Sequence, residues 1–327
     1  MGYCPGVRSL LVITNADAGT SDEETLASAL DVLRREASVE VARTSNPGEL
    51  DGVLHRAGGR TIVVAGGDGS MHAVVKALHK RHDLADATLG LLPMGTGNDF
   101  ARGNDIPLQI EAAAALVLTG EARPVDLLID ETGSIVVNNV HVGIGAQASR
   151  KGEKWKRRLG SVGVGKVNLG KLGYPIGALL SVFDPPSWRL RVEIDGEVVN
   201  DVDKPVLMVA IGNGGNVGGG TELNPDADPE DGRLDVMISR AVSPTAKIGY
   251  AAHLRTGDHD ERDDVLTLRG RSVKVSGEEF WLSADGEITG PERSRSWRLE
   301  QAAYCMILPP MGASAPDEEP DQHSREG

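Results

Sequence analysis

The sequence predicts an α/β protein with two domains, a doubly wound α/β domain followed by an antiparallel β-sandwich. Two apolar runs, 62–65 and 91–92, each end in a glycine-rich loop, which is typical of a buried parallel strand that leads into a turn. Strand-like and helix-like segments alternate up to about residue 126, and short β-rich runs follow. The length of 327 residues suits two domains.

In the first half, strands are predicted over 9–14, 38–43, 62–65 and 91–92, and helices over 21–33, 49–57, 71–81 and 108–118. The third helix illustrates the pattern, since Val74, Val75 and Leu78 share one face. Strands that alternate with helices imply a parallel sheet covered on both faces. Ligands bind such sheets at the carboxyl ends of the strands.

After Asp126 clear helical patterns become scarce. Short β-rich runs are separated by Gly, Asn and Asp, and they lie at 134–140, 188–194, 206–211, 234–238, 265–268 and 272–275. This pattern predicts an antiparallel sandwich. The last segment, 313–327, is rich in proline and acidic residues, and its composition predicts disorder.

The two glycine loops predict that the first domain binds a nucleotide triphosphate. They read Gly66-Gly67-Asp68-Gly69-Ser70 and Gly95-Thr96-Gly97-Asn98-Asp99. Glycine lets a phosphate approach the backbone, and the following helix offers free N–H groups. One such loop alone is usually an ordinary turn, so the pairing carries the prediction. The chain has no GxxxxGK[ST] or GxGxxG loop; the nearest match, 160–166, is followed by Val167 where a hydroxyl is needed.

With Phe100-Ala101-Arg102 added, these loops resemble the diacylglycerol kinase catalytic family, which includes bacterial lipid kinases, sphingosine kinases and ceramide kinases. NAD kinases share the first loop but not the second stretch. The resemblance implies the fold common to NAD kinases and diacylglycerol kinases. It places a nucleotide-binding domain at 8–127 and 298–312, a lipid-substrate β-sandwich at 128–297 and a tail at 313–327. The strand 303–308 would then return to the first domain.

The resemblance also implies an activity, namely transfer of the γ-phosphoryl group of ATP, with Mg²⁺, to a lipid hydroxyl. Diacylglycerol is the expected acceptor, and phosphatidic acid the product. The nucleotide contacts implied lie at strand ends: Asn15, Gly19, Thr44, Gly66, Gly67, Asp68, Gly69, Ser70, Thr96, Asn98 and Asp99. The loop at 15–19 departs from the family's NPxSG pattern, because Ala16 stands in place of proline. The alternatives are a NAD or sphingoid-base kinase, and a nucleotide-binding regulatory module without catalysis.

Three carboxylates are predicted to be catalytic. Phosphoryl transfer needs charge neutralisation on the phosphates and an acceptor for the hydroxyl proton. Asp68 beside a polyphosphate implies a bridging metal ion, although an aspartate in a turn often binds only its own backbone. Asp285 and Glu287 match the family's late Asp-Gly-Glu, with Glu287 as the general base. The same tripeptide at 195–197 is predicted to be a structural hairpin, since Asp-Gly is a strong hairpin signal.

The segment 224–235 is dense in hard oxygen ligands, which suit Mg²⁺, although an acidic surface loop is about as common. It resembles a family segment that binds a structural magnesium ion. The ligands implied are the side chain of Asp231 and the carbonyl groups of Asp228 and Arg233. The resemblance also places Arg102, Asp126 and Lys171 near the cleft between the domains, where the alternative is a set of exposed ion pairs.

Composition limits the partners. A net charge of −14 argues against nucleic acid. Two cysteines, and no recognisable signal peptide or membrane-length apolar run, predict a cytoplasmic protein that meets lipid from the aqueous side. The segment 150–158 holds six basic residues and a tryptophan, which favours peripheral contact with an anionic membrane, and the apolar 172–183 would line an acyl groove. A homodimer is a further hypothesis about partners.

Overall fold

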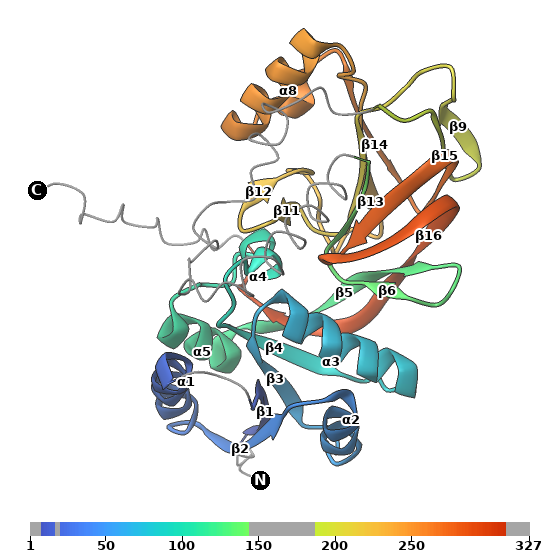
Figure 1. Cartoon of the computed structure of the whole chain (residues 1–327). Helices are drawn as coiled ribbons and strands as arrows, with labels where there is room; N and C mark the ends of the chain where they lie inside the picture. The colour runs from blue at the N-terminus through green and yellow to red at the C-terminus, as the bar shows by residue number, and fades with distance from the viewer. Residues whose placement is uncertain (1–7, 17–19, 144–186, 312–327) are drawn as a thin grey trace, which may run out of the picture.

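The computed structural model describes residues 8–16, 20–143 and 187–311, which form two lobes that share one continuous sheet (Figure 1). The predicted segments 150–158 and 172–183, Gly19, Lys171 and the tail 313–327 lie outside the described residues.

The first lobe contains the predicted parallel sheet. Its strands run in the order β2-β1-β3-β4, with β1 at Arg8–Asn15, β2 at Ala37–Thr44, β3 at Thr61–Gly66 and β4 at Thr88–Pro93. The helices are α1 at Thr20–Leu33, α2 at Pro47–His55, α3 at Asp68–Arg81, α4 at Asp99–Gly103 and α5 at Ile110–Thr119.

Alternate strand residues enter two separate hydrophobic clusters. In β1, Leu11 and Ile13 pack with α2 and α3, whereas Leu10 and Val12 pack with α1 and α5. This is the period-2 alternation of a strand that is buried on both faces. The doubly wound architecture is therefore confirmed.

The predicted start of α3 was wrong. The helix begins at Asp68 and not at Met71, with Gly67 as its N-cap in an extended conformation. The Gly-Asp-Gly-Ser stretch is thus partly the first helical turn, which brings its N–H groups to the helix N-terminus.

The second lobe is antiparallel, as predicted. Its strands are β5 at Glu121–Asp130, β6 at Ile135–Val136, β7 at Asn139–Gly143, β8 at Leu190–Ile194, β9 at Glu197–Asn200, β10 at Met208–Gly212, β11 at Asn216–Val217, β12 at Thr221–Glu222, β13 at Leu234–Ser239, β14 at Val265–Gly270, β15 at Ser272–Ala284 and β16 at Glu287–Leu308. One layer has the order β14-β13-β10-β7-β15 and uses the last part of β15, at 282–284. The other layer contains β9 and β8, which pair with the first part of β15, at 273–277. A shared core of buried side chains fills the space between the layers.

One helix of the second lobe was not predicted. Helix α8 spans Pro244–Thr256, and a 3₁₀ turn, η2, follows at His259–Glu261. Ser243 caps α8 by accepting a hydrogen bond from the N–H of Ala246, and proline occupies the first helical position. This start signal was present in the sequence.

Strand β16 joins the lobes. Its first part pairs with β15, and the rest, as far as Leu308, pairs with β5. Cys305 and Met306 also pair with β4, in parallel. The predicted return of 303–308 to the first lobe is therefore confirmed. The long strand changes direction near Ala302, which has a left-handed φ of 50°.

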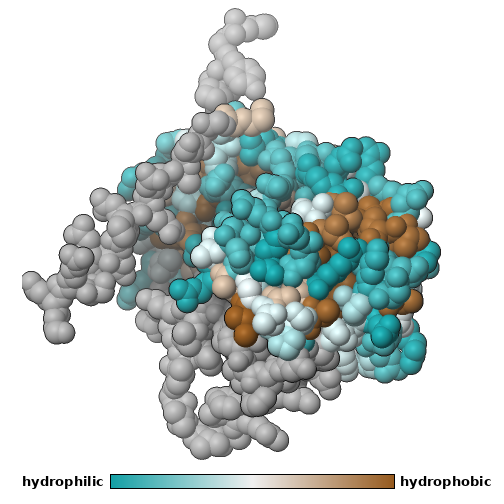
Figure 2. Space-filling model, turned by 90° about the horizontal axis from the view of Figure 1, so that it is seen from above, coloured by the Kyte–Doolittle hydropathy of each residue, from teal (hydrophilic) through white to brown (hydrophobic). Residues whose placement is uncertain are grey.

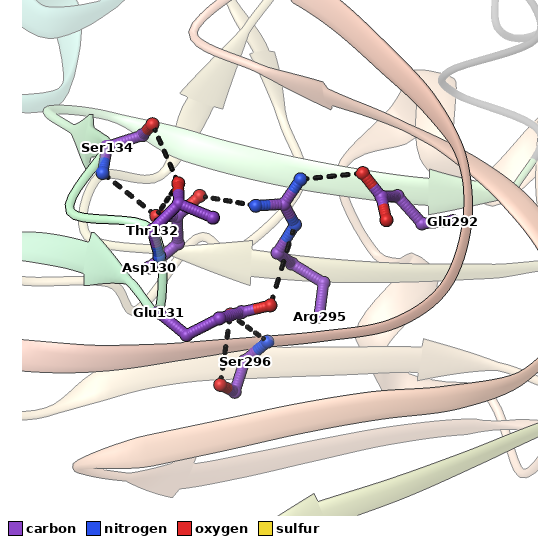
Figure 3. Close-up of polar contacts among 7 residues, drawn as sticks. All are labelled: Asp130, Glu131, Thr132, Ser134, Glu292, Arg295 and Ser296. Carbon is purple, nitrogen blue, oxygen red and sulfur yellow. Dashed lines mark hydrogen bonds and ion pairs between the residues drawn. The ribbon is translucent and has the colours of Figure 1, made fainter.

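A charged cluster fixes the β5–β6 hairpin to β16 (Figure 3). Arg295 binds Asp130 at 3.0 Å and Glu292 at 2.7 Å. The carboxylate of Glu131 accepts hydrogen bonds from the N–H and hydroxyl of Ser296. The Arg295 side chain is only 12% exposed, so the pairs are screened less than surface ion pairs.

The end of the second lobe that carries α8 is partly apolar. Figure 2 views this end and shows hydrophobic residues gathered beside hydrophilic ones. Among the described residues, Val198 and Val202 are 43% and 44% exposed near β9, and Ile248 on α8 is 65% exposed. No helix in the described ranges has the length and apolar character needed to cross a bilayer.

Candidate active site

The two glycine loops touch each other at the carboxyl ends of β3 and β4. A Cβ added to Gly67 would lie 2.7 Å from the Cα of Gly95, and the N–H of Met94 donates to the carbonyl of Gly66 at 3.0 Å. No side chain larger than glycine fits at this crossing. By contrast, a Cβ added to Gly69, in the first turn of α3, would meet nothing within 4 Å. The open side of the loop is therefore at the helix N-terminus.

The other predicted nucleotide residues lie along the same edge. Asn15 and Thr44 are paired at the ends of β1 and β2, and Thr96 is exposed between the glycines of the second loop. Parallel strands place their carboxyl ends at one edge, so the fold brings these positions together. Ser70 lies against Gly66, where a Cβ would be 2.3 Å from the Ser70 hydroxyl.

Asn98 shapes the second loop. It has a left-handed φ of 51°, and its amide both accepts from the N–H of Gly95 and donates to the Gly95 carbonyl, each at 2.9 Å. Asparagine tolerates this backbone region better than most residues. Because its side chain bonds to its own loop, Asn98 supports the site through loop geometry.

Asp68 and Asp99 form a pair of carboxylates at Gly97. Asp68 Oδ1 accepts the N–H of Phe100 at 2.9 Å, which ties the first loop to α4. From the position of a Cβ on Gly97, Asp68 Oδ2 would be 3.1 Å away and Asp99 Oδ2 3.4 Å away. Burial, and then the charge of Asp68, raise the pKa of Asp99.

Asp99 also reaches the second lobe. Its Oδ1 accepts the N–H groups of Gly219 and Gly220 at 2.8 and 2.9 Å. Nearby, Arg102 donates from Nε to the carbonyl of Gly97 at 3.3 Å. The glycine-rich 218–220 loop therefore closes over the start of α4.

Asp126 holds the two lobes together elsewhere. It is 3% exposed, and its carboxylate accepts the N–H of Gly232 and of Ala302, both at 2.8 Å. Burial raises its pKa, while the two backbone hydrogen bonds oppose that rise. The structure thus gives Asp126 an anchoring contact rather than an exposed ion pair.

The late Asp-Gly-Glu forms the tight turn between β15 and β16. Asp285 and Gly286 have φ values of 45° and 85°, as a two-residue hairpin with both central residues left-handed requires. Asp285 Oδ1 accepts the N–H groups of Asn138 and Asn139 at 2.9 and 3.2 Å. Its Oδ2 accepts the N–H of Val137 at 2.7 Å.

A fourth partner of Asp285 comes from the first lobe. The Nδ1 of His72, on α3, lies 2.8 Å from Asp285 Oδ2. A carboxylate has about four acceptor positions, so Asp285 has little capacity left to take a proton from a substrate. Glu287 is exposed, and its side chain has no hydrogen-bond or ion-pair partner among the described residues. Of the two acids, Glu287 is the one available as a base.

The contact between His72 and Asp285 places the turn beside the phosphate-binding helix. His72 follows Asp68 by four residues, which is about 6 Å along a helix and keeps both on one face. The residues in contact are 213 positions apart in the chain. His72 could not be predicted as a site residue, because nothing local distinguishes it from other helical histidines.

Two of the three predicted cation ligands at 228–233 have partners within the protein. Asp231 Oδ1 accepts the N–H of Arg233 at 2.9 Å, and Oδ2 is paired with Arg269. The carbonyl of Asp228 accepts the N–H of Asp231 at 3.4 Å. The loop borders an acidic pocket of about 490 Å³ that Glu230 also lines. One oxygen of the Asp231 carboxylate is thus paired with Arg269, and the cation site at these residues stays a prediction.

The pair of Asp68 and Asp99 fits Mg²⁺. No group of three or more His, Cys, Asp or Glu side chains is placed to hold an ion within the described part of the chain. Magnesium in kinases is usually held by one or two carboxylates together with substrate phosphates. Two carboxylate oxygens beside a phosphate-binding loop match that requirement.

These observations define a class of two-lobed proteins. In this class, paired glycine loops on one lobe lie near an Asp-Gly-Glu turn on the other. Two family models match the chain: the diacylglycerol kinase catalytic domain over residues 9–129, and the YegS C-terminal NAD kinase beta sandwich-like domain over residues 138–302. The chain belongs to this diacylglycerol kinase catalytic-domain family, in its YegS-like branch.

Curated relatives are similar in sequence to this protein along most of the chain. A "probable lipid kinase YegS-like" of Xanthomonas oryzae pv. oryzae is 33% identical over 295 residues, covering 86% of this chain and 89% of the relative. The protein of the same name from Pseudomonas aeruginosa is 33% identical over 283 residues, covering 85% and 87%. A solved diacylglycerol kinase structure from Bacillus anthracis has a TM-score of 0.72 at 24% identity, covering 93% of this chain and 98% of the other. That likeness confirms the predicted fold.

Proposed function

We propose that this protein is a lipid kinase that transfers the γ-phosphoryl group of ATP to a lipid hydroxyl, with diacylglycerol as the acceptor. The observation that carries the proposal is the position of Glu287, an exposed carboxylate without a partner among the described residues, in a turn that is bound to the phosphate-loop helix. The names of the curated relatives support the lipid as acceptor, and those of the solved structures support diacylglycerol.

The proposed reaction uses three parts of the site. The first turn of α3 and the open side of Gly69 receive the phosphates through N–H groups and the helix dipole. Asp68 and Asp99 would hold Mg²⁺, which neutralises phosphate charge when bound. The lipid hydroxyl oxygen attacks the γ-phosphorus, the bond to the ADP oxygen breaks, and the hydroxyl proton passes to Glu287.

The lipid must be reached at a membrane surface. We propose peripheral contact from the aqueous side, through the basic segment 150–158. The exposed Val198, Val202 and Ile248 offer further apolar contact at one end of the second lobe. The proposal needs no transmembrane helix, because peripheral binding relies on surface charge and a few apolar side chains.

A panel of lipids tests the proposal. Purified protein is incubated with radiolabelled ATP, Mg²⁺ and vesicles that contain diacylglycerol, a sphingoid base or ceramide, and separately with NAD. Wild type should label diacylglycerol, and Asp68→Ala should lose that labelling because the carboxylate pair is broken. If NAD or a sphingoid base were labelled instead, that molecule and not diacylglycerol would be the acceptor. ATP binding without transfer to any acceptor would indicate the regulatory module and contradict the proposal.

A further inference from the structure

We propose that His72 is a positioning residue for phosphoryl transfer, which acts by holding the Asp285–Glu287 turn against the phosphate-binding helix. This inference deepens the proposed function and rests on it for the activity measurement. The observations that carry it are the 2.8 Å contact between His72 Nδ1 and Asp285 Oδ2, the other donors bound to Asp285, and the absence of a partner for the Glu287 side chain among the described residues.

The partners of Asp285 come from different lobes. Three of its donors are consecutive backbone N–H groups of 137–139, which belong to the second lobe like Asp285 itself. They shape the turn, but they cannot determine its distance from the nucleotide. His72 is the donor that α3 supplies, and α3 starts in the phosphate loop. The contact therefore ties the turn directly to the helix that begins in the phosphate loop.

The contact is well shielded. The His72 side chain is 12% exposed and that of Asp285 4% exposed. A hydrogen bond to a carboxylate in such surroundings is stronger and more directional than one between neutral groups in water. A buried carboxylate that loses a donor must move or admit water.

His72 acts through Asp285. Its second nitrogen, Nε2, is buried and has no hydrogen-bond partner within the described residues. That nitrogen is shielded from solvent. Since Glu287 is two residues beyond Asp285, a shift of Asp285 carries Glu287 with it. A displacement of about 1 Å of a reacting group can cost about 100-fold in rate.

Side-chain geometry offers matched variants. The amide nitrogen of asparagine reaches about as far from the backbone as Nδ1 of histidine, whereas the amide of glutamine reaches about as far as Nε2. We expect His72→Ala to lower kcat by about 100-fold with KM for ATP changed by less than about twofold. His72→Asn should recover most of the loss, and His72→Gln should not. His79→Ala, on the same helix, is the control and should behave as wild type.

A second measurement does not depend on the reaction. Hydrogen–deuterium exchange of peptides that cover 135–140 and 284–287 should quicken in His72→Ala and return to wild-type rates in His72→Asn. Unchanged exchange in His72→Ala would overturn the positioning role, whatever the activity. So would an unchanged kcat in a folded His72→Ala protein, or equal losses in all three His72 variants. If wild type labels no lipid while exchange responds as expected, the proposed function fails and the positioning contact stands.

Discussion

The chain contains the tripeptide Asp-Gly-Glu twice, and the two copies adopt the same backbone. Asp195 and Gly196 have φ values of 50° and 86°, and the second copy has nearly the same pair of angles. Both connect adjacent antiparallel strands, β8 to β9 and β15 to β16. The local sequence therefore determines the turn in both places.

The surroundings of the two turns differ. The carboxylate of Asp195 accepts the N–H groups of Arg271 and Ser272, which lie in its own lobe at the β14–β15 connection. The carboxylate of Asp285 also has backbone donors, but it reaches His72 on the helix of the other lobe. One hairpin stabilises a sandwich, whereas the other is placed at the interface of two lobes. Function is assigned by that placement and not by the tripeptide.

The largest difference in activity is expected between substitutions of the two glutamates, Glu287 and Glu197. Glu287→Gln removes the proposed base and should lower kcat by about 10²- to 10⁴-fold, the usual contribution of general base catalysis. Glu197→Gln makes the same change in the other hairpin and should leave kcat within about twofold. The measurement is initial rate of lipid phosphorylation at saturating ATP. Equal effects of the two substitutions would remove the distinction between the turns and exclude Glu287 as the base.

A second comparison concerns the two aspartates. Asp285→Ala leaves buried donors of both lobes without an acceptor, and we expect it to cost about 3 kcal/mol of unfolding free energy. Asp195→Ala removes hydrogen bonds at an exposed turn and should cost about 1 kcal/mol. Urea unfolding followed by circular dichroism gives both values. A cost for Asp195→Ala as large as that for Asp285→Ala would show that the interlobe contact adds no stability.

Much of the first lobe could be predicted from its sequence. Apolar runs and helical periodicity are local signals, so the alternation of strands and helices and the positions of both glycine loops were found. The start of α3 was placed three residues late, since Gly-Asp-Gly-Ser has poor helix propensity and Gly67, at the N-cap, has no side chain to cap the helix. The same stretch is helical because tertiary contacts of Asp68 with Phe100 support it.

The second lobe was harder to predict. Strand β16 runs for 22 residues, yet only its end was recognised, because much of its length alternates with charged residues and includes Gly290 and Pro291. The pairing of Asp285 with His72 could not be found by any local pattern, since the contact exists only after the lobes assemble. For the same reason no local pattern indicated that the Asp231 carboxylate meets Arg269.

The smallest expected effect is a change of stability with pH, caused by a histidine on the strand beside the Asp285–Glu287 turn. His141 on β7 lies opposite Ser283 on β15, and its Nε2 is 2.6 Å from Asn139 Oδ1. Burial lowers the pKa of His141 to about 4, although the charge of Asp285 opposes this. A histidine with a depressed pKa contributes stability above its unfolded pKa of about 6.5, and the contribution is lost as pH falls towards 4.

Between pH 6.5 and 4, wild type should therefore lose about 1–2 kcal/mol of unfolding free energy that a His141→Gln variant keeps. This figure is lower than the full pKa shift would give, because the His141 residue is only half-buried. Urea unfolding at pH 7, 5.5 and 4.5 measures the difference between the two proteins. If that difference does not change with pH, folding does not depress the pKa of His141. The contrast between the two hairpins would then rest on the contact of Asp285 with α3 alone.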